Sequence, residues 1–206
     1  MSSAQPTIFV VDDDASVLRG LARLIRSAGY AVETFDSAAQ FLLCGTGDVP
    51  GCVLIDLRMP GMSGLELQER VRTSGCPLPI IFISGETDVS ATVQAMKAGA
   101  LDFLMKPFDE QQLLQAIEAA LDRDSVWRAE RTARQCACTR FASLTPREQE
   151  VCLLVTRGLL NKQIAYQLGN TEKTVKVHRA RVMEKMGVTS VAELVRLVDR
   201  ASVTER

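Results

Sequence analysis

Short apolar runs alternate with longer amphipathic stretches over the first 120 residues, and this alternation restricts the fold more than any other feature of the sequence. Most of the runs are rich in Val and Ile and lack the polar/apolar alternation of a half-exposed strand, which is typical of strands buried on both faces. We predict five strands, over residues 8–11, 31–35, 52–55, 80–83 and 102–105.

The stretches between and after the runs have helical periodicity. The first places Val17, Leu18, Leu21, Leu24 and Ile25 on one face, and Gly29 follows as a stop signal. Further helices are predicted over residues 38–43, 65–71, 89–97 and 110–121. Five strands that each precede a helix predict an α/β fold, a doubly wound five-stranded parallel sheet covered by helices on both faces.

Polar side chains follow four of the predicted strands. These are Asp12, Asp13 and Asp14 after the first, Asp56 after the third, Ser84 after the fourth and Lys106 after the fifth. Ligands of such sheets bind outside the carboxyl ends of the strands, so these groups are expected to converge. Carboxylates this close repel one another unless a cation lies among them, and Mg²⁺ fits a site of few carboxylates completed by water and phosphate oxygens. Asp56 could then attack a phosphoryl group as a nucleophile, with Lys106 stabilising the phosphoryl oxygens.

The charge of the chain is divided unevenly. Residues 1–120 hold 8 Lys and Arg against 15 Asp and Glu, whereas residues 121–206 hold 16 against 10. This division indicates that one half handles cations or phosphate groups and the other a polyanion. No Pro or Gly interrupts residues 122–140, so the last helix of the first half is expected to continue into a helical linker.

The C-terminal segment contains four predicted helices. Thr145, Pro146 and Glu148 form a capping box with proline in the first turn of a helix over residues 146–156. A short helix over residues 162–168, a tight turn at Gly169 and a longer basic helix to Met186 have the pattern of a helix-turn-helix. A fourth helix is predicted over residues 191–198.

The basic helix carries Lys173, Lys176, Val177 and Ala180 on one face, which would face the major groove of DNA. Lys162, Arg179 and Arg181 would reach phosphates.

Four segments together resemble the receiver domain of two-component response regulators: IFVVDDD over residues 8–14, LIDLRMPGMSG over 54–64, IFISG over 81–85 and FLMKPF over 103–108. The resemblance covers about 120 residues and implies a flavodoxin-like fold in which Asp56 accepts the phosphoryl group. It implies as Mg²⁺ ligands Asp12, Asp13, Asp56 and the backbone carbonyl of Arg58. Ser84 and Lys106 would contact the phosphoryl group, and Phe103 would stand at the aromatic switch position, where tyrosine is common. The bond before Pro107 is usually cis in this family.

Residues 144–198 are similar to the LuxR-type DNA-binding domain, with matches at Leu144, Thr145, Glu148, Gly158, Asn161 and His178 among others. The resemblance implies DNA contacts by Lys162, Thr171, Lys173, Thr174, Lys176, Val177, Arg179, Ala180 and Arg181. It implies a dimer contact on DNA by Val191, Leu194, Val195 and Val198. Asn170 replaces the usual apolar residue, and Ala180 stands where some relatives carry a lysine.

A receiver followed by this domain resembles the FixJ and NarL group of transcriptional response regulators, and the linker is similar to that of regulators of aromatic catabolism of the styrene-responsive type. The expected organisation is a receiver over residues 1–121, a helical linker over 122–140 and a second, smaller all-α domain over 141–206. The implied partners are a sensor histidine kinase, promoter DNA, RNA polymerase and, after phosphorylation, a second copy of the chain.

Two alternatives stay open on the sequence alone. One is an enzyme that uses the aspartate nucleophile on a small substrate, although Arg58 stands where a phosphatase has its second carboxylate. The other is a DNA-binding protein whose receiver serves only for dimerisation. The group of regulators that the chain resembles is not enzymatic, and we expect no enzyme.

Other sequence features indicate the compartment. No apolar run approaches the ~20 residues of a membrane span, and the residues before the first strand lack the basic patch of a signal peptide, so a cytoplasmic protein is expected. The cysteines are predicted to be free thiols: Cys44, Cys52, Cys76, Cys136, Cys138 and Cys152. Only Cys136 and Cys138 form a close pair, and His178 is the single histidine, which disfavours a four-ligand zinc site.

Overall fold

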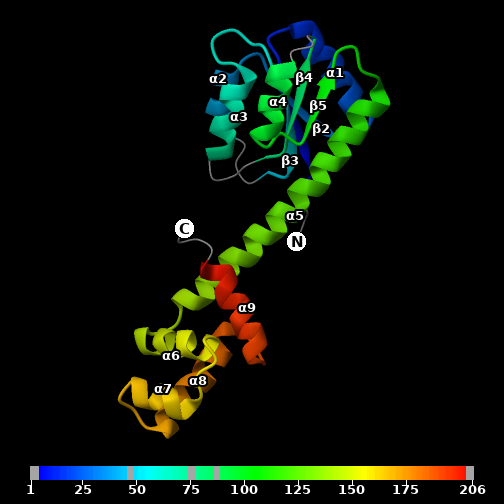
Figure 1. Ribbon diagram of the computed structural model, residues 1–206. Helices are drawn as coiled ribbons and strands as arrows, with labels where there is room; N and C mark the ends of the chain where they lie inside the picture. The colour runs from blue at the N-terminus through cyan, green and yellow to red at the C-terminus, as the bar shows by residue number, and fades with distance from the viewer. Residues whose placement is uncertain (1–4, 46–48, 74–77, 86–88, 203–206) are drawn as a thin grey trace. The chain divides into compact units, whose positions relative to one another are not determined.

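The computed structural model describes residues 5–45, 49–73, 78–85 and 89–202 (Figure 1). The chain forms two compact units that divide between Trp127 and Arg128. Cys76 lies outside the described residues, and the five cysteines within them are free thiols. No helix in the described part of the chain is long and apolar enough to cross a membrane.

The N-terminal unit is built on a parallel sheet of five strands, as predicted. They are β1 (Thr7–Val11), β2 (Ala31–Phe35), β3 (Gly51–Asp56), β4 (Ile80–Ser84) and β5 (Asp102–Met105). The order in the sheet is β2-β1-β3-β4-β5, and each neighbouring pair is parallel. The central strands β1 and β4 are buried along their whole length, which explains why their sequences are apolar without alternation.

Helices cover both faces of this sheet (Figure 1). One face packs against α2 (Ala38–Cys44), α3 (Gly64–Thr73) and α4 (Val89–Lys97). The other packs against α1 (Ala15–Ser27) and the first turns of α5 (Glu110–Ala142). The α/β fold predicted from the alternation of runs and helices is therefore confirmed.

Helix α5 is longer than the amphipathic pattern that predicted its start. It runs for 33 residues, and its first turns bury Leu113, Ile117 and Ala120 against the sheet. Asp124, which is also buried, accepts a hydrogen bond of 3.0 Å from the backbone N–H of Gly51 at the start of β3. The helix thus stays in contact with the N-terminal unit beyond residue 121.

The C-terminal unit contains α6 (Pro146–Thr156), α7 (Asn161–Gln167), α8 (Glu172–Met186) and α9 (Val191–Ser202) around one apolar core. The capping box at the start of α6 has both predicted bonds: Thr145 N–H donates to Glu148 Oε2 at 2.9 Å, and Glu148 N–H donates to Thr145 Oγ1 at 3.3 Å. Glu148 also accepts a hydrogen bond of 2.6 Å from Lys185 Nζ near the end of α8. This buried carboxylate therefore connects two helices of the unit.

Candidate functional site

The carboxyl edge of the sheet brings two carboxylates and one amine together. Lys106 Nζ lies 2.8 Å from Asp12 Oδ2 and 3.0 Å from Asp56 Oδ1. The three residues follow different strands, β1, β3 and β5, and meet because the ends of parallel strands share one edge. Asp12 is buried and Asp56 is nearly so, whereas the ammonium of Lys106 is partly exposed to solvent.

Backbone groups orient the two carboxylates. The N–H of Asp14 donates to Asp12 Oδ1 at 2.9 Å, and the N–H of Arg58 donates to Asp56 Oδ2 at 2.8 Å. The chain also passes close to Asp56 at Gly64, where a Cβ would come within 2.5 Å of the Asp56 carbonyl oxygen. A glycine is needed there because any side chain would push the start of α3 away from the site.

Burial changes the pKa values in this site. Loss of solvent raises the pKa of Asp56, although the hydrogen bonds and charge of Lys106 oppose the change. Partial burial acts to lower the pKa of Lys106, but its hydrogen bonds to Asp12 and Asp56 outweigh this effect and raise it. The amine therefore stays charged, and it offsets one of the two carboxylates that it contacts.

The remaining predicted receiver residues differ in burial. Ser84 is buried at the end of β4, and its carbonyl oxygen accepts a hydrogen bond of 2.7 Å from the Lys106 N–H. Phe103 is half-buried, with its ring centroid 6.4 Å from that of Phe82, so it forms part of the packing around the sheet. Asp13 is exposed, and the peptide bond before Pro107 is cis, as the resemblance implied.

The donor chemistry of this edge fits Mg²⁺. Two carboxylates share one ammonium, so the site keeps negative charge for a cation to neutralise. No group of three or more His, Cys, Asp and Glu side chains in the described segments is already arranged to hold a metal. That finding still agrees with Mg²⁺, because this ion takes one or two carboxylates and completes its shell with water and phosphate oxygens.

A second candidate site lies on α8 of the C-terminal unit. Its buried face consists of Val175, Val182 and Met186. The predicted groove-facing residues are all exposed: Lys173, Lys176, Val177 and Ala180. The predicted phosphate contacts Lys162 and Arg181 are also exposed, as a surface that binds a polyanion requires.

Three other predicted DNA contacts, Thr171, Thr174 and Arg179, are engaged within the protein. Thr171 caps α8, and its hydroxyl accepts a hydrogen bond of 3.2 Å from the Thr174 N–H. Arg179 Nη1 donates to Asn161 Oδ1 at 3.0 Å, which ties α8 to the start of α7. Sequence reasoning recorded Asn161 only as a match to the family, and no local pattern signals this contact because 18 residues separate the two partners.

The structure corrects the dimer surface predicted on α9. Leu194 is 0% exposed and Val198 is 4% exposed, and both pack in the core of the C-terminal unit. They cannot meet a partner without unfolding this core. Only Val191 and Val195 of the predicted set are partly exposed.

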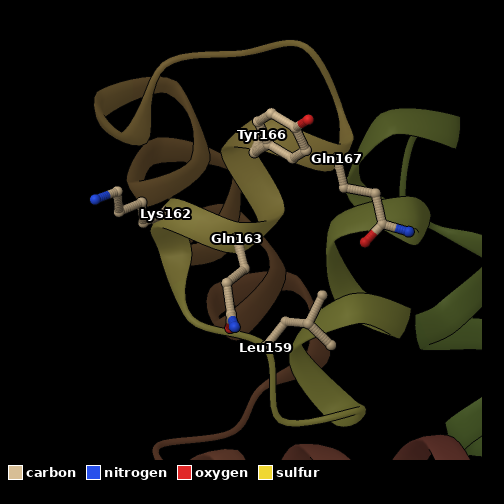
Figure 2. A pocket seen from close by; sticks show the side chains of 5 residues that line it. All are labelled: Leu159, Lys162, Gln163, Tyr166 and Gln167. Carbon is tan, nitrogen blue, oxygen red and sulfur yellow. The ribbon is translucent and has the colours of Figure 1, made fainter.

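The segment before α7 and the helix itself expose apolar side chains that sequence reasoning missed. Leu160 is 69% exposed and Tyr166 is 92% exposed. A cavity of about 550 Å³ lies beside Tyr166, and Figure 2 shows the side chains that line it: Leu159, Lys162, Gln163, Tyr166 and Gln167. Exposed apolar groups at a cavity favour contact with another molecule.

Comparison with known proteins assigns both units to families. The response regulator receiver domain matches residues 8–118, and the luxR family of bacterial regulatory proteins matches residues 142–198. The chain belongs to the response regulators with a LuxR-type DNA-binding domain. It is thus a member of a family of transcriptional regulators.

Other response regulators are similar along nearly the whole chain. Nodulation protein W of Bradyrhizobium diazoefficiens is 45% identical over 98% of this chain and 89% of its own. The response regulator protein TodT of Pseudomonas putida strain F1 is 46% identical over 97% of this chain and 88% of its own.

Solved structures agree with this assignment. The response regulator StyR is 52% identical, with a TM-score of 0.84 over 96% of this chain and all of that one. Full-length FixJ from B. japonicum is 42% identical, with a TM-score of 0.59 over 97% of this chain and 98% of that one. The predicted membership in the FixJ-like group is confirmed.

Proposed function

We propose that this response regulator accepts a phosphoryl group on Asp56 from a sensor histidine kinase and then binds promoter DNA as a dimer. The observation that carries the proposal is the contact of Lys106 with both Asp12 and Asp56 at the carboxyl edge of the sheet. This arrangement offers a nucleophilic oxygen beside a fixed positive charge, which is what phosphoryl transfer requires of a protein.

In the proposed reaction an Asp56 oxygen attacks phosphorus while the bond from phosphorus to the kinase histidine nitrogen breaks. The product is an acyl phosphate, and the histidine leaves with its electron pair. Lys106 would exchange its hydrogen bond to Asp56 for one to a phosphoryl oxygen, and Ser84 would contact another. Mg²⁺ held by Asp12, Asp13, Asp56 and the Arg58 carbonyl would supply further positive charge for the phosphoryl oxygens.

Phosphorylation adds about 1.5 to 2 negative charges at the sheet edge where β5 ends and after which α4 begins, and this bias would shift the receiver to a dimerising state. Exposed apolar residues on these elements support a dimer contact there: Val89, Val93, Met96 and Met105. On DNA the second contact would come from Val191 and Val195 of α9. Phe103, at the start of β5, would respond to the movement of Ser84.

We also propose domain boundaries for the protein. We propose a receiver over residues 1–121, a linker over 122–140 whose first turn is bound to the receiver through Asp124, and a DNA-binding domain over 141–206. Promoter contacts would come from Lys162, Thr171, Lys173, Thr174, Lys176, Val177, Arg179, Ala180 and Arg181. A regulator with these partners acts in the cytoplasm, where the exposed surface of α7 would be available to RNA polymerase.

The test is intact mass and DNA affinity, measured on wild type and Asp56→Ala with Mg²⁺ and a small phosphodonor. We expect one added phosphoryl group on wild type only, and roughly tenfold tighter binding of promoter DNA, which is within the usual range of allosteric coupling. Asp36→Ala, an exposed aspartate after β2, is the matched control and should behave as wild type. Phosphorylation of Asp56→Ala would refute the acceptor assignment, and turnover of a small phosphorylated substrate would favour an enzyme.

A further inference from the structure

The side chain of Arg147 connects α6 with the turn of the helix-turn-helix. Arg147 lies in the first turn of α6, and its Nη2 donates a hydrogen bond to the carbonyl oxygen of Leu168 at the end of α7. The Asn170 amide, with its oxygen turned toward Arg147, accepts a hydrogen bond of 3.2 Å from Nε. One guanidinium therefore holds both sides of the turn at Gly169.

This turn determines where α8 begins. Gly169 has a φ of +64°, and the N–H groups of Leu168 and Asn170 donate to carbonyl oxygens of α7. Thr171 follows directly as the N-cap of α8. These backbone bonds connect the turn to α7, whereas Arg147, which stands 21 residues before Leu168 in the chain, connects it to α6.

All three nitrogens of the Arg147 guanidinium have partners within the protein. Its third nitrogen, Nη1, donates to Glu150 Oε2 at 2.6 Å, so each nitrogen of the guanidinium has an acceptor. The carboxylate of Glu150 beside it would also repel a DNA phosphate. These contacts place Arg147 to orient α6 and the turn relative to each other.

We propose that Arg147 and Asn170 are positioning residues that hold α8 for base recognition and so determine the sequence specificity of the protein. The proposal rests on the DNA-binding function proposed above. Base contacts depend on the angle at which α8 meets the groove, whereas phosphate contacts tolerate small shifts because they are largely electrostatic. Loss of the Arg147 contacts should weaken specific binding much more than non-specific binding.

The experiment uses the full-length protein and a DNA site that the wild type selects from a random-sequence pool. Affinities for this site and for random-sequence duplex of equal length are measured for wild type, Arg147→Gln, Asn170→Leu and the double variant. We expect the ratio of the two affinities, selected site over random duplex, to fall roughly tenfold in Arg147→Gln, about the equivalent of one base contact. The double variant should lose no more than Arg147→Gln alone, because both substitutions break the same link.

Controls separate positioning from direct contact and from folding. Arg157→Gln removes an exposed arginine at the end of α6 and should leave the preference unchanged. The salt dependence of binding should not change in Arg147→Gln, since a lost phosphate contact would lower the slope by about 0.9. Asn170→Leu introduces the apolar residue that is usual at this position in the family and leaves Arg147 in place. It therefore tests the Arg147–Asn170 contact even if Arg147→Gln lowers the melting temperature.

An unchanged preference in Arg147→Gln and Asn170→Leu would overturn the positioning role, and so would a reduced salt slope. If the wild type selected no sequence from the pool, the DNA-binding function itself would fail, and the positioning role with it.

Discussion

The pKa of Asp56 is raised and that of Glu148 is lowered, because the two carboxylates have different partners. Asp56 shares its amine with Asp12, so burial dominates and raises its pKa. Glu148 has the amine of Lys185 and the backbone N–H of Thr145 to itself, and these hydrogen bonds lower its pKa to about 2. The raised pKa of Asp56 agrees with its proposed role as phosphoryl acceptor, whereas the hydrogen bonds of Glu148 stabilise the fold.

We expect Glu148→Gln to destabilise the C-terminal unit by about 1–3 kcal/mol at pH 7, because the Lys185 amine then faces a neutral amide instead of a buried carboxylate. The folded-state pKa of Glu148 lies below its ordinary value of 4.5, so its stabilisation is complete above that pH and is lost as the pH falls toward about 2. Calorimetric melting temperatures of wild type and variant should therefore converge as the pH falls from 5 to about 2. Glu184→Gln, an exposed glutamate on α8, should change neither quantity, and a constant gap across this range would contradict the assignment.

The elements differ in how well local sequence predicted them. Strand positions were predicted within about one residue, because β1, β3 and β4 are buried on both faces and their apolar runs end in polar residues at the edge of the sheet. The continuation of α5 past residue 121 is compatible with the absence of Pro and Gly, but the contact of Asp124 with Gly51 has no local signal. Its partners stand 73 residues apart.

Asp124→Ala should destabilise the N-terminal unit by about 1–3 kcal/mol, because the buried N–H of Gly51 loses its acceptor. The measurement is urea unfolding followed by the fluorescence of Trp127, the single tryptophan, which lies one helical turn further along α5. Asp122→Ala, an exposed aspartate of the same helix, is the control. Equal urea midpoints for the two variants would show that the Asp124 contact contributes nothing.

On α9 the substitutions Leu194→Ala and Val195→Glu should separate folding from dimerisation. Leu194→Ala should cost about 2–5 kcal/mol of stability, since it removes a fully buried side chain. Val195→Glu should leave the melting temperature nearly unchanged and remove the preference for paired DNA half-sites over single ones. A Val195→Glu protein that still prefers paired sites would exclude this part of α9 from the dimer contact.

At the scale of the whole molecule, the two units carry opposite charge: the acidic half holds the proposed phosphoacceptor site and the basic half the proposed DNA-binding face of α8. Neither site accounts for the exposed Leu160 and Tyr166. The stretch over residues 151–171 contains no Asp or Glu, so this surface suits a protein partner that presents apolar and acidic groups.

The double variant Leu160→Ser/Tyr166→Ser should therefore lower transcription by purified RNA polymerase severalfold while promoter affinity stays within about twofold of wild type. Leu43→Ser, which alters an 86% exposed leucine in the N-terminal unit, is the matched control for loss of surface hydrophobicity. An equal loss of promoter affinity would assign the surface to DNA, and unchanged transcription would exclude it as a polymerase contact.

The sequence by itself determined the α/β class, the five strands, the meeting of Asp12, Asp56 and Lys106 at one sheet edge, and the capping box of α6. Each follows from local periodicity or from the rule that parallel strands end at one edge. Only the tertiary structure decided that Leu194 and Val198 are core residues, because an apolar helix face has the same pattern whether it packs inside its own unit or against a partner. The contacts of Arg147 with Asn170 and of Asp124 with Gly51 were likewise decided only by packing. Their partners lie far apart in the sequence, so no periodic pattern predicts them.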